Sequence, residues 1–302
     1  MRDEPLQSRD ASSRPPTRPA TVVTGASSGI GRALAQVIAR EGGPIVLIGR
    51  SPEGLSAAAA EVRKAGGEPF VLELDLSLID APQKIEDFVA AHGLFCDVLV
   101  NSAGYGLRGA AATLPIEDQL GIVDLNIRAL TDLTLRLISG MAARRRGGVI
   151  NLSSVAGALP GPYMALYYAS KAFVRSFSLA LHQELAPSGV TVTCVAPGPV
   201  RTRFLDRAGA GTAGLFRILP ELDADDVAEQ AWRGFKSGKR LIVPGISAKL
   251  TTLAASLIPS AAMLPLVGRL QLKGGDPCPC GSGKKFRKCC GASRFQRRRS
   301  AS

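Results

Sequence analysis

Seven short runs of mainly β-branched and apolar residues alternate with longer helical patterns, and this alternation restricts the fold more than any other feature. The runs are Thr21–Thr24, Ile45–Ile48, Phe70–Leu74, Val98–Val100, Val149–Leu152, Val190–Val195 and Leu241–Val243. Ala/Leu-rich segments that can form helices begin at Gly31, Glu53, Ala81, Ile116, Tyr163 and Ala224. Apolar strands that alternate with helices pair in parallel and are covered on both faces. The sequence therefore predicts an α/β domain with a doubly wound parallel sheet of about seven strands.

Changes in composition divide the rest of the chain. We predict a disordered lead at residues 1–19, the α/β domain at 20–246, an apolar helical or lid segment at 247–273, a metal-binding motif at 274–292 and a basic disordered tail at 293–302. The lead is rich in Arg, Pro and Ser and has no apolar signal core. We therefore expect no secretion, a cytoplasmic location and reduced cysteines.

The basic charge is concentrated near the C-terminus. The net charge is +12, but ten Lys/Arg and one Asp between Val267 and Ser302 supply +9 of it, and residues 20–266 carry only +2. The main domain is therefore nearly neutral. The basic end would favour an acidic protein face, RNA or an anionic lipid surface, unless it serves solubility alone.

Leu250 to Gly268 is a stretch of nineteen residues without a charge. Its length approaches that of a membrane span. However, Pro259 and Pro265 would interrupt a single helix. We expect a helix–turn–helix lid packed on the main domain, or a segment in peripheral contact with a membrane surface.

A glycine-rich turn, T-G-A-S-S-G-I-G at 24–31, follows the first predicted strand. Its glycines let the backbone turn tightly and approach a pyrophosphate, which binds at the positive N-terminus of the next helix. At the end of the second predicted strand stands Arg50, with no carboxylate beside it. A cation at this position favours the 2′-phosphate of NADP(H) over NAD(H). An exposed arginine without a ligand is the alternative.

Tyr167 and Lys171 are four residues apart, so a helix would place both side chains on one face. An ammonium beside a phenol lowers the pKa of the tyrosine and brings it closer to use as a general acid/base. Taken alone, the two residues could equally form a surface pair.

The chain resembles the short-chain dehydrogenase/reductase family over about residues 20 to 245. The matching motifs occur in the family's order: T-G-A-S-S-G-I-G at 24–31, D-L-S at 75–77, N-S-A-G at 101–104, Asn126, N-L-S-S at 151–154, Y-Y-A-S-K at 167–171 and P-G-P-V-R-T at 197–202. Ser102 is one departure, because many relatives carry asparagine there. The resemblance implies a Rossmann-like fold and a homo-oligomer formed through helices near 116–143 and 163–186.

The resemblance also implies the catalytic roles. Tyr167, and not Tyr168, would donate the proton, and Ser154, rather than Ser153, would hold the substrate carbonyl oxygen. Lys171 would bind the nicotinamide ribose and lower the tyrosine pKa. Asn126 matches the residue that holds a water in the proton relay.

The same resemblance implies the residues that bind NADP(H). They are Gly25, Ser27, Ser28, Gly29, Ile30, Gly31, Arg50, Asp75, Leu76, Asn101, Ala103, Gly104, Tyr167, Lys171, Pro197, Gly198, Val200 and Thr202. Hydride transfer between the nicotinamide and a carbonyl carbon follows, with proton transfer at Tyr167. The Gly/Ala-rich span Arg203 to Pro220 suggests a mobile apolar lid and an apolar small-molecule substrate. A cofactor-sensing interaction protein is the alternative function.

Four cysteines gather near the C-terminus: Cys278, Cys280, Cys289 and Cys290. Four thiolates around a short turn can bind Zn²⁺ tetrahedrally, and the spacing does not fit the common redox motif. The string resembles the SEC-C motif, the zinc tail of the bacterial preprotein translocase motor ATPase. That resemblance implies a docking role toward a chaperone, ribosome or other protein partner in a bacterial protein.

Overall fold

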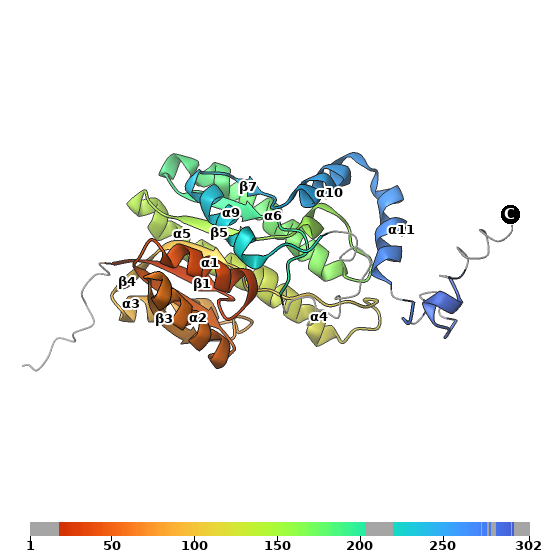
Figure 1. The fold of residues 1–302 in the computed structure, drawn as a ribbon, viewed down its shortest axis with the longest axis horizontal. Helices are drawn as coiled ribbons and strands as arrows, with labels where there is room; N and C mark the ends of the chain where they lie inside the picture. Colours follow the sequence, from red (N-terminus) through yellow and green to blue (C-terminus); the bar gives the residue numbers. More distant parts are fainter. Residues whose placement is uncertain are drawn as a thin grey trace, which may run out of the picture.

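The computed structural model describes residues 18–202, 220–272, 274–276, 278, 282–290 and 292. Its strands are β1 (Arg18–Thr24), β2 (Pro44–Gly49), β3 (Glu68–Glu73), β4 (Leu94–Asn101), β5 (Gly148–Leu152), β6 (Thr191–Val195) and β7 (Leu241–Ile242). They form one parallel sheet in the order β3-β2-β1-β4-β5-β6-β7 (Figure 1). All seven predicted strands are confirmed. The predicted lead up to residue 17, the span 203–219, Cys280 and the tail from residue 293 lie outside the described residues.

Helices cover both faces of this sheet, as predicted (Figure 1). One face carries α1 (Gly29–Ala39), α2 (Pro52–Ala65) and α9 (Ala224–Lys236), and the other carries α3 (Ala81–Ala91), α5 (Leu130–Arg144) and α6 (Ala165–Leu185). Successive strand residues point to opposite faces. Val23 therefore packs in the first layer and Val22 in the second, and both are fully buried. Because both faces are covered, β2 and β5 are buried along their whole length.

The chain first builds the sheet outward from β1 to β3 on one side, and then adds β4 to β7 on the other side of β1. β1 pairs with β2 on one side and with β4 on the other, so the following loops diverge at this point. In open α/β sheets, ligands bind outside the carboxyl ends of the strands at such a switch point. The glycine turn follows β1, and Ser102 to Gly104 follow β4. The topology therefore brings two of the predicted cofactor segments together.

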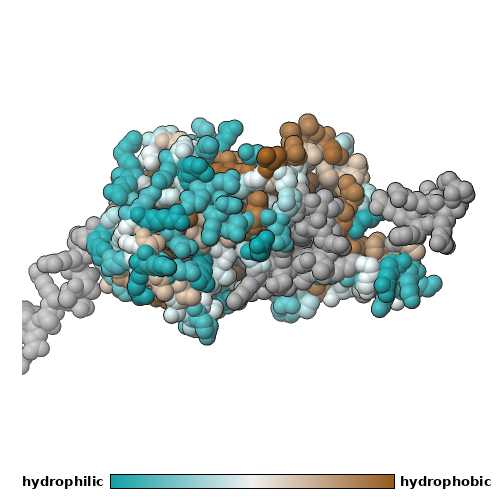
Figure 2. Space-filling view, in the orientation of Figure 1, coloured by the Kyte–Doolittle hydropathy of each residue, from teal (hydrophilic) through white to brown (hydrophobic). Residues whose placement is uncertain are grey.

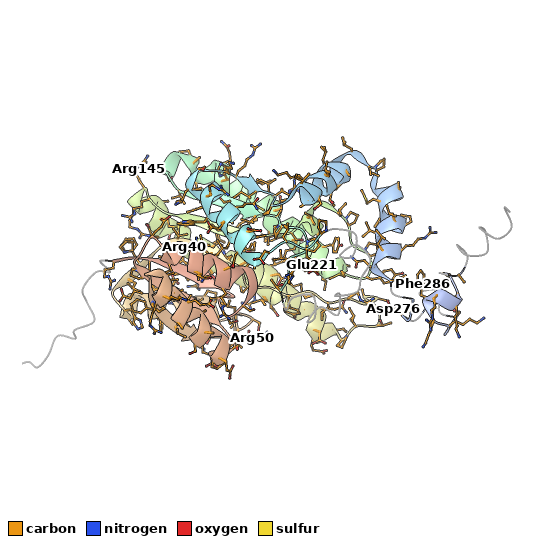
Figure 3. The ribbon with its side chains drawn as sticks, viewed as in Figure 1. Arg40, Arg50, Arg145, Glu221, Asp276 and Phe286 are labelled. Atoms are coloured by element: carbon orange, nitrogen blue, oxygen red, sulfur yellow. The ribbon has the colours of Figure 1, made fainter. Side chains whose placement is uncertain are left out.

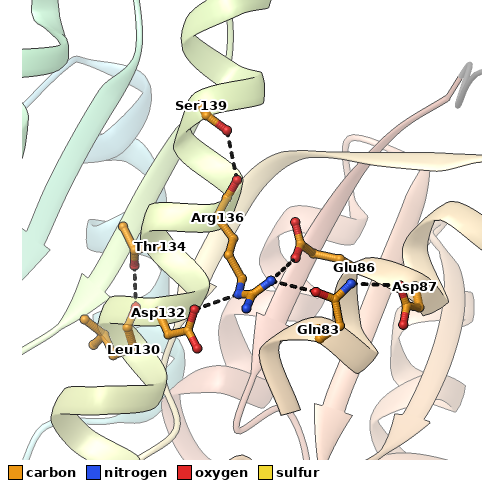
Figure 4. A network of polar contacts seen from close by, with 8 residues as sticks. All are labelled: Gln83, Glu86, Asp87, Leu130, Asp132, Thr134, Arg136 and Ser139. Atoms are coloured by element: carbon orange, nitrogen blue, oxygen red, sulfur yellow. Dashed lines mark hydrogen bonds and ion pairs between the residues drawn. The ribbon is translucent and has the colours of Figure 1, made fainter. Parts of the chain in front are cut away.

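Polar contacts on the outer surface join α3 to α5 (Figure 4). The Arg136 guanidinium of α5 bonds to Asp132 one turn before it, at 2.6 Å. It also donates to Gln83 at 2.7 Å and Glu86 at 2.9 Å, both on α3. Exposed pairs of this kind contribute little individually, about 0.2–1 kcal/mol. Their effect is to fix the mutual orientation of two helices whose apolar faces are already buried.

Two further helices, α10 (Ile246–Leu257) and α11 (Ser260–Gln271), follow the sheet. They meet at Ile258–Pro259, so the uncharged stretch forms no single long helix. Met263 and Val267 of α11 pack against Tyr167 and Tyr168 of α6. Within the described part of the chain, none of the helices has the length and apolar composition that a membrane crossing requires.

The outward side of these two helices is apolar. Ile246, Leu250 and Leu257 are between 61% and 78% exposed. In the space-filling view, hydrophobic surface gathers over this end of the molecule (Figure 2). α10 and α11 therefore have one face on the α/β domain and another that is unusually apolar for an exposed surface.

Candidate active site

The glycine turn has the backbone geometry that its sequence predicts. Gly25 has φ +67° and Gly29 has φ +59°, values at which other residues are strained. A Cβ on Gly31 would lie 2.6 Å from the Gly25 carbonyl oxygen, so only glycine allows α1 to start here. Ser28 precedes α1 without a side-chain cap, and the first turn holds no acidic residue. The N–H groups of α1 thus remain available for an anion.

A cleft of about 700 Å³ opens at the carboxyl end of the sheet. This volume lies within the range of small-molecule sites, roughly 300–1,000 Å³. Its lining includes most of the predicted cofactor residues: Gly25, Ser27, Ser28, Gly29, Ile30, Arg50, Asp75, Leu76, Ala103, Gly104, Tyr167, Lys171, Pro197, Gly198, Val200 and Thr202. Gly31 and Asn101 are absent from the lining. Residues from six loops and helices therefore meet in one cavity.

Arg50 occupies the end of the cleft beyond β2 (Figure 3). Ser51 caps α2 by accepting a bond from the Gly54 amide at 3.1 Å, which fixes the backbone next to Arg50. The Arg50 guanidinium lies 3.5 Å from the Asp75 carboxylate and is 60% exposed. Partial burial alone would raise the pKa of Asp75, but bonds from Ser77 and the charge of Arg50 hold it below its ordinary value. The guanidinium thus remains accessible to an anionic ligand.

Ser154, Tyr167 and Lys171 lie together in the cleft and all are buried. Ser154 follows β5, and the other two lie one turn apart on α6. Ser154 bonds to the Tyr167 phenol, whereas the Ser153 hydroxyl donates to the Lys171 carbonyl at 2.7 Å. The Lys171 Nζ donates to the Leu152 carbonyl oxygen at 2.8 Å and lies 5.9 Å from the centre of the Tyr167 ring. Both serines line the cleft, and Ser154, which the family resemblance implied, is the one that bonds to the Tyr167 phenol.

The expected lowering of the tyrosine pKa is not what the structure shows. Burial raises the pKa of Tyr167 to about 12, and the Ser154 bond opposes this only in part. Burial also lowers the pKa of Lys171 to about 8. The pKa of Tyr167 lies above its ordinary value because desolvation of the phenol outweighs any opposing effect of Lys171, whose ammonium bonds to the Leu152 carbonyl. Tyr167 is consequently a neutral phenol at physiological pH and can donate a proton.

Asn126 lies in a π-helical turn, η1 (Asp124–Ala129), between α4 (Ile116–Val123) and α5. Such turns insert an extra residue and often occur at functional sites. The Asn126 amide bonds to both the N–H and the carbonyl of Tyr105, at 3.1 and 2.9 Å, and to the Ser170 hydroxyl at 3.0 Å. Asn126 is 1% exposed and does not line the cleft. Its contacts instead position the loop after β4.

Asn101 also has a role inside the domain. It donates to Thr134 and to Asn151, each at 2.9 Å, and Asn151 donates to Ser178 at 3.0 Å. All four side chains are buried. The network joins β4 and β5 to α5 and α6. The family resemblance implied that Asn101 binds the cofactor, but its side chain lies in this internal network and does not line the cleft.

The loop after β6 closes the cleft from the other side. A Cβ on Gly29 would lie 3.0 Å from the Thr202 methyl group, so this loop contacts the glycine turn. Leu222 forms a bridge with Val200 and bonds to Pro199 and Arg201. Residues on either side of the span 203–219 are therefore held side by side at the cleft.

Tyr105 and Gln271 are two contributors that the motifs did not identify. Tyr105 lines the cleft, and its hydroxyl donates to the Asp118 carbonyl at 2.9 Å. Gln271, at the end of α11, is fully buried and donates to the Tyr168 hydroxyl at 2.7 Å. Tyr105 directly follows the N-S-A-G motif, and that proximity was the one available signal. Gln271 is 103 residues from Tyr168 and had none.

Three of the predicted metal ligands lie close together. The sulfur atoms of Cys278, Cys289 and Cys290 all lie within 4.8 Å of one another. The Cys278 amide bonds to the Lys284 carbonyl at 2.8 Å, which holds these two residues together. The Ser282 hydroxyl lies 3.2 Å from the Cys289 sulfur. Three converging thiols fit a zinc site, with Cys280 outside the described residues as the fourth candidate.

We expect the purified protein to contain about one Zn²⁺ per chain and Cys289→Ser to retain less than about a fifth of it, because a lost thiolate opens the tetrahedral site. Metal analysis by mass spectrometry measures both. Cys96→Ala is the matched control, since this buried cysteine lies on β4 in the core. Equal zinc in wild type and Cys289→Ser would contradict the site.

The chain resembles known proteins in two separate parts. The family model described as short chain dehydrogenase matches residues 19–212, and the SEC-C motif matches residues 276–292. Serine 3-dehydrogenase of Rhizobium radiobacter is 36% identical over 212 residues, which cover 68% of this chain and 84% of the relative. Very-long-chain 3-oxoacyl-CoA reductase of Mus musculus is 35% identical over 188 residues, covering 61% and 60%. A short-chain dehydrogenase from Sphingobium yanoikuyae in complex with NADPH has a TM-score of 0.70 at 30% identity, covering 81% of this chain and 95% of that one.

Proposed function

The chain belongs to the short-chain dehydrogenase family and is an oxidoreductase of that family, and from this premise we propose that it interconverts a carbonyl and an alcohol with NADP(H). Tyr167 acts as the general acid/base. The observation that carries the proposal is the meeting of Ser154, Tyr167 and Lys171 in the same cleft as the glycine turn. A bound nicotinamide supplies the hydride.

The protein's own residues supply the proton and hold the oxygen. The Ser154 hydroxyl bonds to the phenol, so a carbonyl oxygen in the cleft can accept from both groups. Tyr167 donates its proton as negative charge develops on that oxygen. Lys171, one turn away, is mostly protonated at neutral pH and stabilises the resulting phenolate. Met263 and Val267 of α11 belong to the same apolar cluster as Tyr167, whose side chain is only 5% exposed.

The preference for NADP(H) rests on Arg50. We expect Arg50→Glu to lower kcat/KM for NADPH by roughly 10–100-fold, because a charge-assisted bond to the 2′-phosphate is worth about 1.5–3 kcal/mol. Activity with NADH should not fall, since its ribose carries a hydroxyl. Arg63→Glu is the control, because Arg63 is exposed on α2 and outside the cleft. Parallel loss with both cofactors would contradict the assignment.

The substrate class, assembly and location are further parts of the proposal. The relatives act on serine and on 3-oxoacyl-CoA by their names. The apolar cluster that Met263 and Val267 form with Tyr167 favours an apolar carbonyl substrate. Exposed Ile116, Leu120 and Leu135 on α4 and α5 support a homo-oligomer. We place the protein in the cytoplasm. The apolar outer face of α10 and α11 would allow peripheral contact with a membrane surface.

A carbonyl panel followed by NADPH absorbance tests the function. It contains a short 3-oxoacyl thioester, a bulky apolar ketone and, for the reverse direction, L-serine with NADP⁺. We expect turnover of at least one apolar carbonyl. Tight NADPH binding with equal inertness of wild type and Tyr167→Phe across the panel would instead favour the cofactor-sensing interaction protein.

A further inference from the structure

The C-terminal segment that carries the clustered cysteines (residues 274–292) is here called the cysteine module. It is attached to the catalytic domain through a well-buried ion pair. Arg108, in the loop after β4, donates to the two carboxylate oxygens of Asp276 at 2.6 and 3.2 Å. Their side chains are only 14% and 19% exposed. Asp276 lies two residues before Cys278, and its carbonyl accepts from the Phe286 amide at 2.7 Å (Figure 3). A freely moving tail would not bury such a pair at its first residues.

The same arginine reaches the active site through Gln271. Arg108 also donates to the Gln271 carbonyl at 3.2 Å. The Gln271 side chain in turn holds the Tyr168 hydroxyl, and the Tyr168 ring stands edge-on to Tyr167 with centroids 6.0 Å apart. A continuous series of contacts thus runs from the module to the catalytic tyrosine.

A second group of contacts surrounds Tyr163, which precedes α6. Its carbonyl accepts from the Gly109 amide at 2.9 Å, so it is joined to the loop that carries Arg108. Tyr163 also has φ +66°, a strained value that persists where surrounding contacts enforce it. The loop that the module holds through Arg108 is therefore bonded to the segment that precedes α6.

We propose that the metal-bound module positions the loops around the catalytic tyrosine, with Arg108, Gln271 and Asp276 as the positioning residues. A segment this short has no core of its own, so metal binding is what fixes the backbone between Asp276 and Cys290. A fixed Asp276 keeps Arg108 in place through the ion pair. Arg108 in turn bonds to the Gln271 carbonyl, and the Gln271 side chain bonds to the Tyr168 hydroxyl. The expected effect on KM rests on the proposed carbonyl reaction. The expected effect on hydrogen exchange does not depend on that reaction.

Hydrogen exchange of the full-length protein tests this proposal. The segments to follow are 105–115 and 158–168, in zinc-loaded protein, chelated protein and Asp276→Asn. We expect chelation and Asp276→Asn each to raise exchange there by about tenfold, with zinc content unchanged in Asp276→Asn. The charge exchange Arg108→Asp with Asp276→Arg should restore protection only in part, because an aspartate at position 108 cannot donate to the Gln271 carbonyl. Arg146→Gln is the control, since it removes an ion pair with Asp97 at the other end of β4 and β5.

The kinetic constants of Asp276→Asn distinguish a role in positioning the loops at the substrate end from a general effect on the stability of the protein. With the best carbonyl of the panel, we expect Asp276→Asn to raise KM about tenfold, to change kcat less than about twofold and to leave NADPH affinity unaltered, because the contacts lie at the substrate end. Equal exchange in loaded and chelated protein would overturn the proposal, as would loss of zinc in Asp276→Asn. Should no carbonyl be reduced, the proposed function fails, while the exchange result still decides whether the module holds these loops.

Discussion

Tyr167→Phe is expected to lower kcat for carbonyl reduction by about 10³–10⁴-fold, because it removes the group that protonates the substrate oxygen. Phenylalanine preserves the ring and its packing against Met263 and Val267. NADPH affinity should stay within about threefold of wild type, since the substitution removes only one oxygen from the cleft. Steady-state kinetics and NADPH fluorescence titration measure the two quantities.

Tyr168→Phe is the matched control for this substitution. It removes the neighbouring phenol oxygen, whose partner is Gln271, and leaves the Tyr167–Ser154 contact in place. We expect kcat to remain within about fivefold of wild type. Comparable loss of kcat in both variants would show that Tyr167 has no special chemical role.

Lys171→Met is expected to lower kcat by about 10²–10³-fold and, unusually for a buried substitution, to stabilise the fold. The pKa of Lys171 falls from its ordinary value of 10.5 to about 8 because the ammonium is buried. At neutral pH its charge therefore costs the folded state about 3 kcal/mol. Methionine removes that cost but leaves the Leu152 carbonyl unpaired, at about 1–2 kcal/mol. We expect a net rise in Tm of roughly 2–6 °C.

The pH dependence gives an independent check on Lys171. Between pH 8 and 10.5 the unfolded chain binds this proton and the folded protein does not, so wild-type stability should rise with pH in this window relative to Lys171→Met. From pH 8 to 10 the difference amounts to roughly 2 kcal/mol. Activity should fall over the same range, because the stabilising charge is lost. Denaturant unfolding at each pH measures the first effect, and parallel pH profiles for both proteins would contradict the assignment.

Local patterns were sufficient to predict the sheet and the cleft. The strands are short apolar runs, and the glycine turn and the Tyr167–Lys171 spacing are encoded within a few residues. The π-helical turn at Asp124–Ala129 was not predictable in this way, since one extra residue in a helix leaves the apolar pattern nearly unchanged. The direction of the Tyr167 pKa shift depends on burial, which spacing alone does not reveal.

The attachment of the cysteine module was equally hidden from the sequence. Arg108 and Asp276 are 168 residues apart, and each occurs in a segment that reads as a polar loop. The charge pattern suggested a tail that binds an external partner. The structure instead shows its first described residues in contact with the catalytic domain, at the end of the molecule away from α3 (Figure 1).

Deuterium transfer tests the central account most directly. The protein is incubated with the panel carbonyl and NADPH deuterated at both C4 positions, and the alcohol is analysed by mass spectrometry. We predict one deuterium on the carbinol carbon with wild type and at most a trace of labelled alcohol with Tyr167→Phe. An alcohol without deuterium, or equal labelled product from both proteins, would contradict hydride transfer assisted by Tyr167.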